Sequence, residues 1–134
     1  GAVACWGNNS AGKLGNGDTQ EQSVPTAVVD VPMPQGYDAV SAGTAHTCAV
    51  HQNGLYCWGD DNGNQLGDEE LAPYSDTPAR ITPLAFTSLT TGASHSCAID
   101  GAGALFCWGD NLHGVIGDGT EAKAAPVVIL PPPP

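Results

Sequence analysis

Short apolar stretches alternate with clusters of turn-forming residues along most of the chain. Between residues 37 and 83 the strand-like stretches lie near 37–42, 47–51, 55–58 and 79–82, and glycine, asparagine, aspartate and proline separate them. Such an alternation of short strands and turns is typical of a small antiparallel sheet. The pattern therefore predicts one four-stranded unit in this part of the chain.

The unit repeats with a period of about 50 residues. The block Cys5-Trp6-Gly7 recurs as Cys57-Trp58-Gly59 and as Cys107-Trp108-Gly109. A second block, Gly43-Thr44-Ala45-His46-Thr47-Cys48, recurs as Gly92-Ala93-Ser94-His95-Ser96-Cys97. Helical solenoids need long amphipathic helices that this chain lacks, whereas a four-stranded repeat of this length fits a propeller blade. We therefore predict an all-β fold of tandem four-stranded antiparallel propeller blades.

These blocks resemble the repeats of the regulator of chromosome condensation family. The resemblance rests on Gly-x-x-His-Thr/Ser-Cys at 43–48 and 92–97, on the Trp-Gly pairs, and on Asn-x-x-Gly-x-Leu/Ile-Gly at 9–15 and 111–117, from which residues 61–67 depart slightly. Members of the family form seven-bladed propellers, so the resemblance implies that this chain holds about two and a half blades, open or completed by other chains. Propellers serve many functions, so the resemblance predicts the fold better than the function.

The repeat divides the chain into four predicted parts. We expect a partial blade over 1–36, a blade over 37–86, a blade over 87–130 that is incomplete at its end, and a polyproline tail over 131–134. The partner of Cys5 would lie upstream of residue 1, and the third repeat stops before another histidine-cysteine block. We therefore expect the chain to begin and end inside blades.

The cysteines follow the predicted hairpins. Cys48 and Cys57 flank a four-residue turn, and Cys97 and Cys107 flank a three-residue turn. An antiparallel hairpin with either turn places the two thiols opposite each other, at a separation that a disulfide can bridge. No Cys-x-x-Cys occurs, so disulfides Cys48–Cys57 and Cys97–Cys107 are favoured over a metal site, and Cys5 is left unpaired or intermolecular.

The net charge and the predicted disulfides limit the kinds of partner and the compartment that we expect for this chain. Fourteen acidic residues face three basic ones, Lys13, Arg80 and Lys123, and this excess of negative charge would repel the phosphates of nucleic acid. No apolar run is long enough to span a bilayer. Persistent disulfides need an oxidising compartment, so we expect an extracellular or cell-surface protein, a secreted, bacterial-like variant of the family.

Residues that suggest chemistry have structural explanations. His46 and His95 fit no catalytic or metal-ligand spacing. The family resemblance implies that they form hydrogen bonds within the sheet. His51 and His113 are expected in exposed turns, and the recurring tryptophans in the core. The oxygen-rich stretch at 60–70 lacks the glycine and glutamate positions of an EF-hand. We expect no enzyme activity, metal or cofactor; Asn8 is a possible glycosylation site.

Two functions remain open at this stage. In the first, a structural or adhesive extracellular module self-assembles into a ring or fibre because neighbouring copies complete its blades. In the second, a fragment of a seven-bladed propeller binds or inhibits a protein partner through its blade loops. Residues 20–22, 69–75 and the tail differ between repeats, so they are the candidates for recognition. An exchange factor for a small GTPase, which the resemblance also suggests, conflicts with the predicted disulfides.

Overall fold

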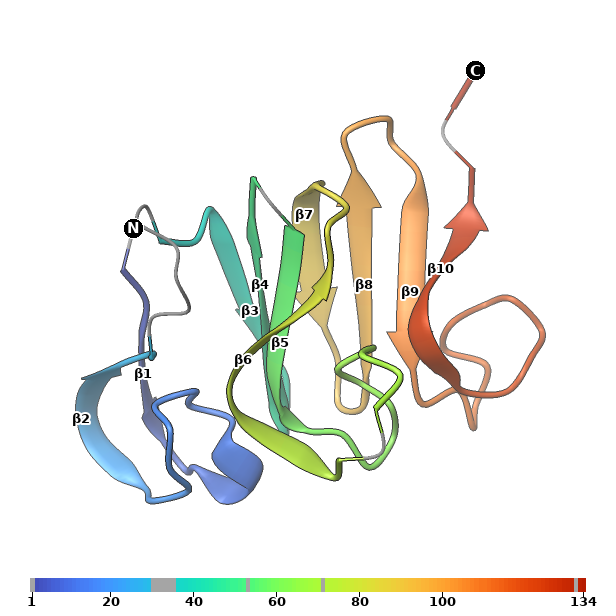
Figure 1. The fold of residues 1–134 in the computed structure, drawn as a ribbon. Helices are drawn as coiled ribbons and strands as arrows, with labels where there is room; N and C mark the ends of the chain where they lie inside the picture. The colour runs from blue at the N-terminus through green and yellow to red at the C-terminus, as the bar shows by residue number, and fades with distance from the viewer. Residues whose placement is uncertain (1, 30–35, 53, 71, 132) are drawn as a thin grey trace.

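A computed structural model of the chain contains three antiparallel sheets and no α-helix in the part that it describes (Figure 1). It describes residues 2–29, 36–52, 54–70, 72–131 and 133–134. The elements, in chain order, are β1 (Ala4–Gly7), the 3₁₀ turn η1 (Ser10–Gly12), β2 (Gln22–Ala27), β3 (Ala39–Ala42), β4 (His46–His51), β5 (Gly54–Asp60), β6 (Tyr74–Thr82), β7 (Phe86–Thr91), β8 (His95–Asp100), β9 (Leu105–Gly109) and β10 (Lys123–Leu130). The predicted all-β fold of antiparallel sheets is confirmed.

The middle sheet, which we call the second blade, has the strand order β3-β4-β5-β6. Its central hairpin pairs β4 with β5, and Cys48 stands opposite Cys57 as the sequence predicts. His51 still pairs with Gly54, so the turn is shorter than the four residues we expected. β6 begins at Tyr74, whereas the sequence predicted a start near residue 79. The first part of the strand was missed because a bulge in its pairing with β5 interrupts the apolar alternation.

The other two sheets repeat parts of this arrangement. The third blade has the strand order β10-β9-β8-β7, with Cys97 opposite Cys107. We expected this blade to be incomplete at its end, but β10 pairs with β9 and supplies a fourth strand. The first sheet contains β1 and β2. Because Cys5 is equivalent to Cys57, β1 and β2 correspond to β5 and β6 of the second blade. We call the strands at these two positions the outer strands of a blade, and the two strands before them the inner strands.

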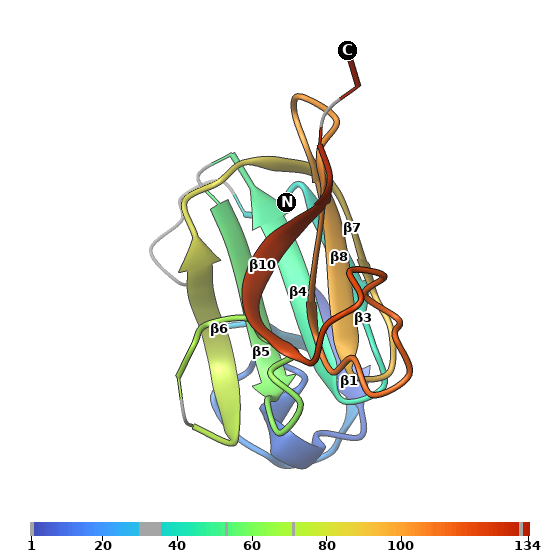
Figure 2. The ribbon, with the colours of Figure 1, turned by 90° about the vertical axis from the view of Figure 1, so that its right-hand side faces the viewer.

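Apolar side chains fill the spaces between neighbouring sheets. The core between the first sheet and the second blade contains Ala49, Tyr56 and Trp58. The core between the second and third blades contains Cys48, Val50, Leu55, Cys57, Leu66, Phe86, Ala98 and Trp108. Successive residues of β4 therefore point to opposite cores, as the pleat of a strand requires. The sheets stand side by side like the blades of a propeller, as Figures 1 and 2 show from two directions.

The C-terminal end extends past β10, away from the sheets (Figures 1 and 2). Pro133 lies beside the turn between β8 and β9, where a Cβ atom added to Gly103 would come within 2.9 Å of the proline ring. Residue 132 of the predicted polyproline tail and residues 30–35 of the predicted first part lie outside the described residues. No helix formed by the described residues is long and apolar enough to cross a membrane.

Candidate protein-binding surface

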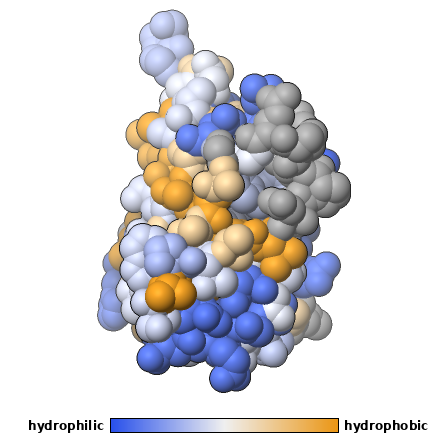
Figure 3. Space-filling model, turned by 90° about the vertical axis from the view of Figure 1, so that its left-hand side faces the viewer, coloured by the Kyte–Doolittle hydropathy of each residue, from blue (hydrophilic) through white to orange (hydrophobic). Residues whose placement is uncertain are grey.

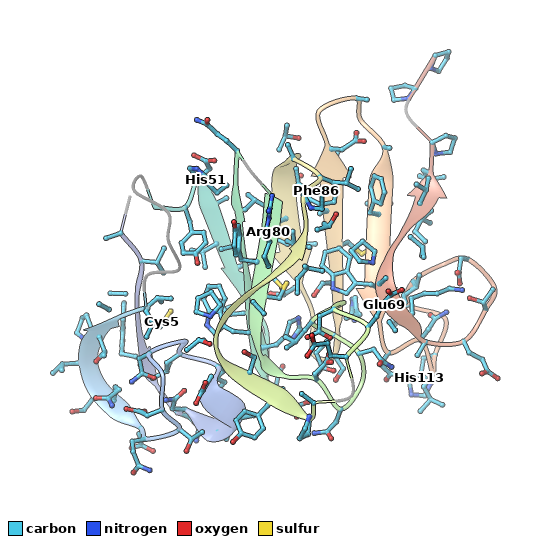
Figure 4. The ribbon with its side chains drawn as sticks, viewed as in Figure 1. Cys5, His51, Glu69, Arg80, Phe86 and His113 are labelled. Atoms are coloured by element: carbon cyan, nitrogen blue, oxygen red, sulfur yellow. A yellow bond between two sulfur atoms is a disulfide. The ribbon has the colours of Figure 1, made fainter. Side chains whose placement is uncertain are left out.

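Three long loops lie at the same end of the three sheets. Residues 8–21 join β1 to β2, residues 61–73 join β5 to β6, and residues 110–122 join β9 to β10. All three lie toward the lower end in Figure 1, opposite the turn between β4 and β5. Figure 4 places Glu69 and His113 on the side of these loops. We call this side of the molecule the loop end.

One buried side chain closes each of these loops. The side-chain oxygen of Asn9, Asp61 or Asn111 accepts a hydrogen bond of 2.9 Å from the backbone N–H five residues later. All three side chains are at most 7% exposed. This role was not predicted from the sequence, although the recurrence of Asn or Asp five residues before Leu or Ile is the signal that marks these side chains.

The first two loops are also tied to the outer strand of the next blade. The N–H of Gly17 donates to the carbonyl of Asp76 in β6 at 3.0 Å, and the N–H of Glu69 donates to the carbonyl of Ala124 in β10 at 3.1 Å. Gly17 and Glu69 occupy equivalent positions, with φ of +84° and +61°. Because these contacts fix the backbone, the loop end presents its side chains on a preformed surface.

The loop end is strongly acidic. Its four glutamates, which are all the glutamates of the chain, are exposed: Glu21, Glu69, Glu70 and Glu121. The aspartates of the same three loops are Asp18, Asp61, Asp68, Asp110 and Asp118. Two lysines also lie there, but Lys13 donates to the carbonyl of Thr44 and Lys123 forms an ion pair with Asp118 at 3.3 Å. The excess of negative charge suits a positively charged partner.

Two aspartates of the loop end have shifted pKa values. Burial raises the pKa of Asp61 to about 6, and the neighbouring carboxylates of Asp68 and Asp60 contribute to the increase. Asn9 occupies the position equivalent to Asp61 one repeat earlier. It has an amide in place of the carboxyl group, and this amide donates a hydrogen bond of 3.0 Å to the Oδ1 of Asn16. Hydrogen bonds from the side chain and backbone of Thr120 lower the pKa of Asp118. Asp118 therefore carries its charge at neutral pH.

The structure brings together both predicted cysteine pairs. The Sγ atoms of Cys48 and Cys57 lie 2.14 Å apart, and those of Cys97 and Cys107 lie 2.13 Å apart. The Cα atoms are 4.1 Å apart in each pair, the close approach of residues directly opposite in antiparallel strands. Cys5 is a free thiol whose pKa is raised by burial. It lies on β1, in the sheet that has two strands (Figure 4).

Two of the three recurring tryptophans contact the preceding sheet. Trp58 and Trp108 are fully buried, but Trp6 is 61% exposed, so its predicted place in the core was wrong. The indole of Trp58 lies over Gly15 of the preceding loop, where an added Cβ would come within 2.5 Å of Nε1, and Trp108 lies over Gly67 in the same way. Trp6 lies on β1, in the first sheet of the described chain.

The histidines correct two further expectations. His46 is fully buried, and its Nε2 lies 2.8 Å from Ser96 Oγ of the third blade, so it links two blades instead of strands of one sheet. Burial lowers the pKa of His46 to about 4. His51 is 8% exposed because it lies within β4, where it pairs with Gly54, and its Nδ1 lies 3.6 Å from a carboxylate oxygen of Asp38. Gly43 allows close approach, since a Cβ atom there would clash with the carbonyl of Gly92.

The remaining candidates show no ligand geometry. The described residues hold no group of three or more His, Cys, Asp or Glu side chains placed to bind a metal ion. In the stretch at 60–70, Asp60 instead accepts hydrogen bonds from the side chains of Asn62 and Gln65. Asn8 is exposed, with its Oδ1 accepting a 2.7 Å hydrogen bond from the Ser10 hydroxyl. Its glycosylation stays a prediction.

Comparison with protein families returns a repeat match over most of the chain. The model of the "Regulator of chromosome condensation (RCC1) repeat" matches residues 1–50 and 52–99, and a second RCC1 repeat model matches residues 37–65 and 86–115. The probable E3 ubiquitin-protein ligase HERC6 of Homo sapiens is 33% identical over 130 residues, which cover 92% of this chain and 13% of HERC6. The ultraviolet-B receptor UVR8 of Arabidopsis thaliana is 32% identical, over 89% of this chain and 28% of UVR8.

Solved structures resemble the chain in fold. Prp20p from Saccharomyces cerevisiae superimposes with a TM-score of 0.85 at 21% identity, over 97% of this chain and 34% of Prp20p. Human WBSCR16 superimposes with a TM-score of 0.81 at 22% identity, over 97% of this chain and 33% of WBSCR16. The chain thus spans about a third or less of the length of these proteins.

Proposed function

The chain belongs to the RCC1 repeat family, and from this premise we propose that it is a protein-binding part of a β-propeller that recognises a basic protein surface through its loop end. The observation that carries the proposal is the loop end itself, where every glutamate of the chain is exposed on loops that hydrogen bonds hold in place. Complementary charge of this kind speeds association and selects partners. We propose no catalytic role for the chain.

The related structures support a protein as the partner. The structure of Prp20p is described together with its binding to Gsp1p and histones, and a second structure shows Kap60 bound to yeast RCC1 (Prp20). Histones are rich in arginine and lysine, which match an acidic surface in charge. The match supports a basic partner for this chain.

Partner binding fits the structure better than self-assembly. Completion of the first sheet by a second copy would need a spare pair of inner strands. The inner hairpins of the described chain, β3–β4 and β7–β8, already pair with β5 and β9 within their own blades. A second copy would therefore have to give up its own blade in order to complete the first sheet of its neighbour.

Binding to a purified H2A–H2B histone dimer, used as a basic protein probe, tests the proposal. A double variant at the loop end, Glu69→Gln with Glu70→Gln, should weaken the Kd about threefold to tenfold at low salt. The matched control, Asp38→Asn with Asp100→Asn, removes the same charge from outside the three loops and should change the Kd less than about twofold. Equal effects of the two pairs, or a Kd that does not respond to salt, would contradict binding at the loop end.

A further inference from the structure

A groove of about 190 Å³ lies between the outer strands β6 and β10 of the second and third blades. Its walls are apolar and are formed by Ile81, Leu84, Ala125 and Pro126. Asp68 and Glu69 of the loop end also line it. The volume is below the roughly 300–1,000 Å³ of sites for drug-sized ligands, so the groove has room for a single side chain.

Val128 on β10 adds exposed apolar surface on the same side. It stands opposite Phe106 of β9, and side chains that stand opposite each other in a sheet share a face. Phe106 packs against the core between the second and third blades, so Val128 also points toward the second blade. Val128 is 53% exposed and Leu84 is 48% exposed. The two blades therefore leave apolar surface between them that no described residue covers.

Two carboxylates stand at one end of the groove. Glu69 is exposed and lies beside β10, as Figure 4 shows. Its backbone N–H donates to the carbonyl of Ala124 at 3.1 Å, which fixes the position of the residue against the third blade. Asp68 is held by a hydrogen bond of 3.0 Å that its Oδ1 accepts from the N–H of Glu70. Neither Asp68 nor Glu69 forms an ion pair with another described residue.

The equivalent positions between the first sheet and the second blade carry different side chains. Gly17 stands in place of Glu69, and Arg80 holds the position on β6 that Val128 holds on β10. Glu69 has a φ of +61°, which favours glycine, so the chain keeps a glutamate where glycine fits the backbone better. Figure 3 shows a largely hydrophilic surface at the lower end of the side that carries β1 and β2. Packing between blades is common to both junctions, whereas the combination of apolar walls and carboxylates is not.

Lysine and arginine have the two properties that this groove requires. Their methylene stems pack on apolar surface while the charged group stays at the end that faces water. An apolar side chain such as leucine would cover the walls but would leave the carboxylates without a cation. A small free cation would pair with the carboxylates but would gain nothing from the walls.

We propose that the groove between β6 and β10 binds one lysine or arginine side chain of the basic partner, with its stem between Leu84 and Pro126 and its charged group at Glu69. This inference rests on the proposed function, which supplies the partner, and adds the position at which one partner side chain is held. Burial of the stem adds a contribution to binding that salt does not screen, unlike the attraction between exposed charges.

The test compares two peptides of equal charge but different stem length, octalysine and an octamer of 2,4-diaminobutyric acid, whose stem is two methylenes shorter. The full chain should bind octalysine about fivefold more tightly at low salt, because the shorter stem buries less apolar surface. Leu84→Ser should reduce this ratio to less than about twofold. The matched control Leu112→Ser removes an exposed leucine of the third loop, outside the groove, and should leave the ratio unchanged.

A second pair of variants tests the charged end of the groove. Glu69→Gln should weaken the Kd for octalysine about threefold at low salt. Glu121→Gln removes the same charge from an exposed residue of the third loop and should weaken the Kd by less than about 1.5-fold. Isothermal titration calorimetry measures the binding of each variant.

The possible failures of the groove and of the proposed function give different results. Equal Kd values for the two octamers, or a ratio that the two leucine variants reduce alike, would overturn the groove site while salt-dependent binding of the H2A–H2B dimer stands. A wild-type chain that binds neither the octamers nor the histone dimer would overturn the proposed function together with the groove. Leu84 and Leu112 are 48% and 80% exposed, so both serine variants should fold, and circular dichroism checks this.

Discussion

Trp58 donates a hydrogen bond of 3.0 Å from its indole Nε1 to the carbonyl oxygen of Lys13, 45 residues earlier in the chain and in the loop of the preceding sheet. Trp108 makes the equivalent bond, also 3.0 Å, to the carbonyl of Gln65. Each carbonyl accepts a second bond from the hydroxyl of Thr47 or Ser96. The recurring tryptophan therefore joins its blade to the one before it.

The first prediction concerns the indole N–H. Trp58→Phe keeps an aromatic ring but removes this donor and leaves a gap in the core, so it should lower the free energy of unfolding by about 2 kcal/mol. The control Trp6→Phe changes a side chain that is 61% exposed and should cost less than about 0.5 kcal/mol. Urea denaturation followed by circular dichroism measures both, and a similar loss in the two variants would contradict the inter-blade role of Trp58.

The second prediction concerns the glycine beneath that ring. Gly15→Ala would place a methyl group against the Trp58 indole at φ +71°, whereas Gly117→Ala at φ +83° meets nothing within 4 Å. The backbone cost of about 1–2 kcal/mol is shared by the two variants. The steric cost belongs to Gly15 alone and should add about 1–3 kcal/mol. Thermal or urea unfolding should therefore separate two glycines at the same repeat position, and equal losses would show that the ring does not rest on Gly15.

The third prediction is a pH dependence at Asp61. Its folded pKa of about 6 lies above the 3.8 of an ordinary aspartate side chain, so the folded state binds the proton more tightly and the ionised carboxylate lowers stability at neutral pH. Asp61→Asn, which installs the side chain found at residues 9 and 111, should raise the free energy of unfolding by about 1 kcal/mol near pH 7. The gain should shrink as the pH falls through about 6 toward 4.

Glu21→Gln is the control for this change, since it removes one exposed negative charge from another loop of the same end. Urea unfolding of the wild-type chain and both variants at a series of pH values gives the comparison. A stabilisation by Asp61→Asn that is constant with pH, or that Glu21→Gln reproduces, would show that Asp61 does not carry the shifted proton.

The fourth prediction concerns the thiols. The chain has five cysteines, so two disulfides leave one thiol that reacts in denaturant before reduction and five that react after it. Cys48→Ala should lower the free energy of unfolding by about 3 kcal/mol through loss of a short cross-linked loop, whereas Cys5→Ala should have a smaller effect. Five reactive thiols in freshly isolated, unreduced protein would contradict the pairing and the expectation of an oxidising compartment that depends on it.

The sequence predicts the fold well because its signals are local or periodic. The facing of Cys48 and Cys57 follows from one hairpin, and the blades follow from the recurrence of the cysteine-tryptophan block. These local and periodic signals do not predict which residues contact each other between blades. A period shows that Trp6 and Trp58 are equivalent, but it does not show which neighbour covers each, and so Trp6 was wrongly placed in the core.

The acidic surface was only partly predictable. The excess of acidic residues is plain in the sequence, and residues 20–22 and 69–75 were expected to carry recognition because they differ between repeats. That three loops lie at one end of the molecule requires the strand pairing, which places every connection between outer strands on the same side. The partner of His46 was also missed, because Ser96 is 50 residues away in another blade.

The most direct test of the account is a nitrogen-15 NMR titration of the full chain with the H2A–H2B dimer at low salt. Binding at the loop end predicts that the amide signals which shift first belong to residues 8–21, 61–70 and 110–122, and that added salt reverses the shifts. Shifts concentrated instead at the turns near Gln52 and Ala102, at the opposite end of the blades, would contradict the proposed binding surface.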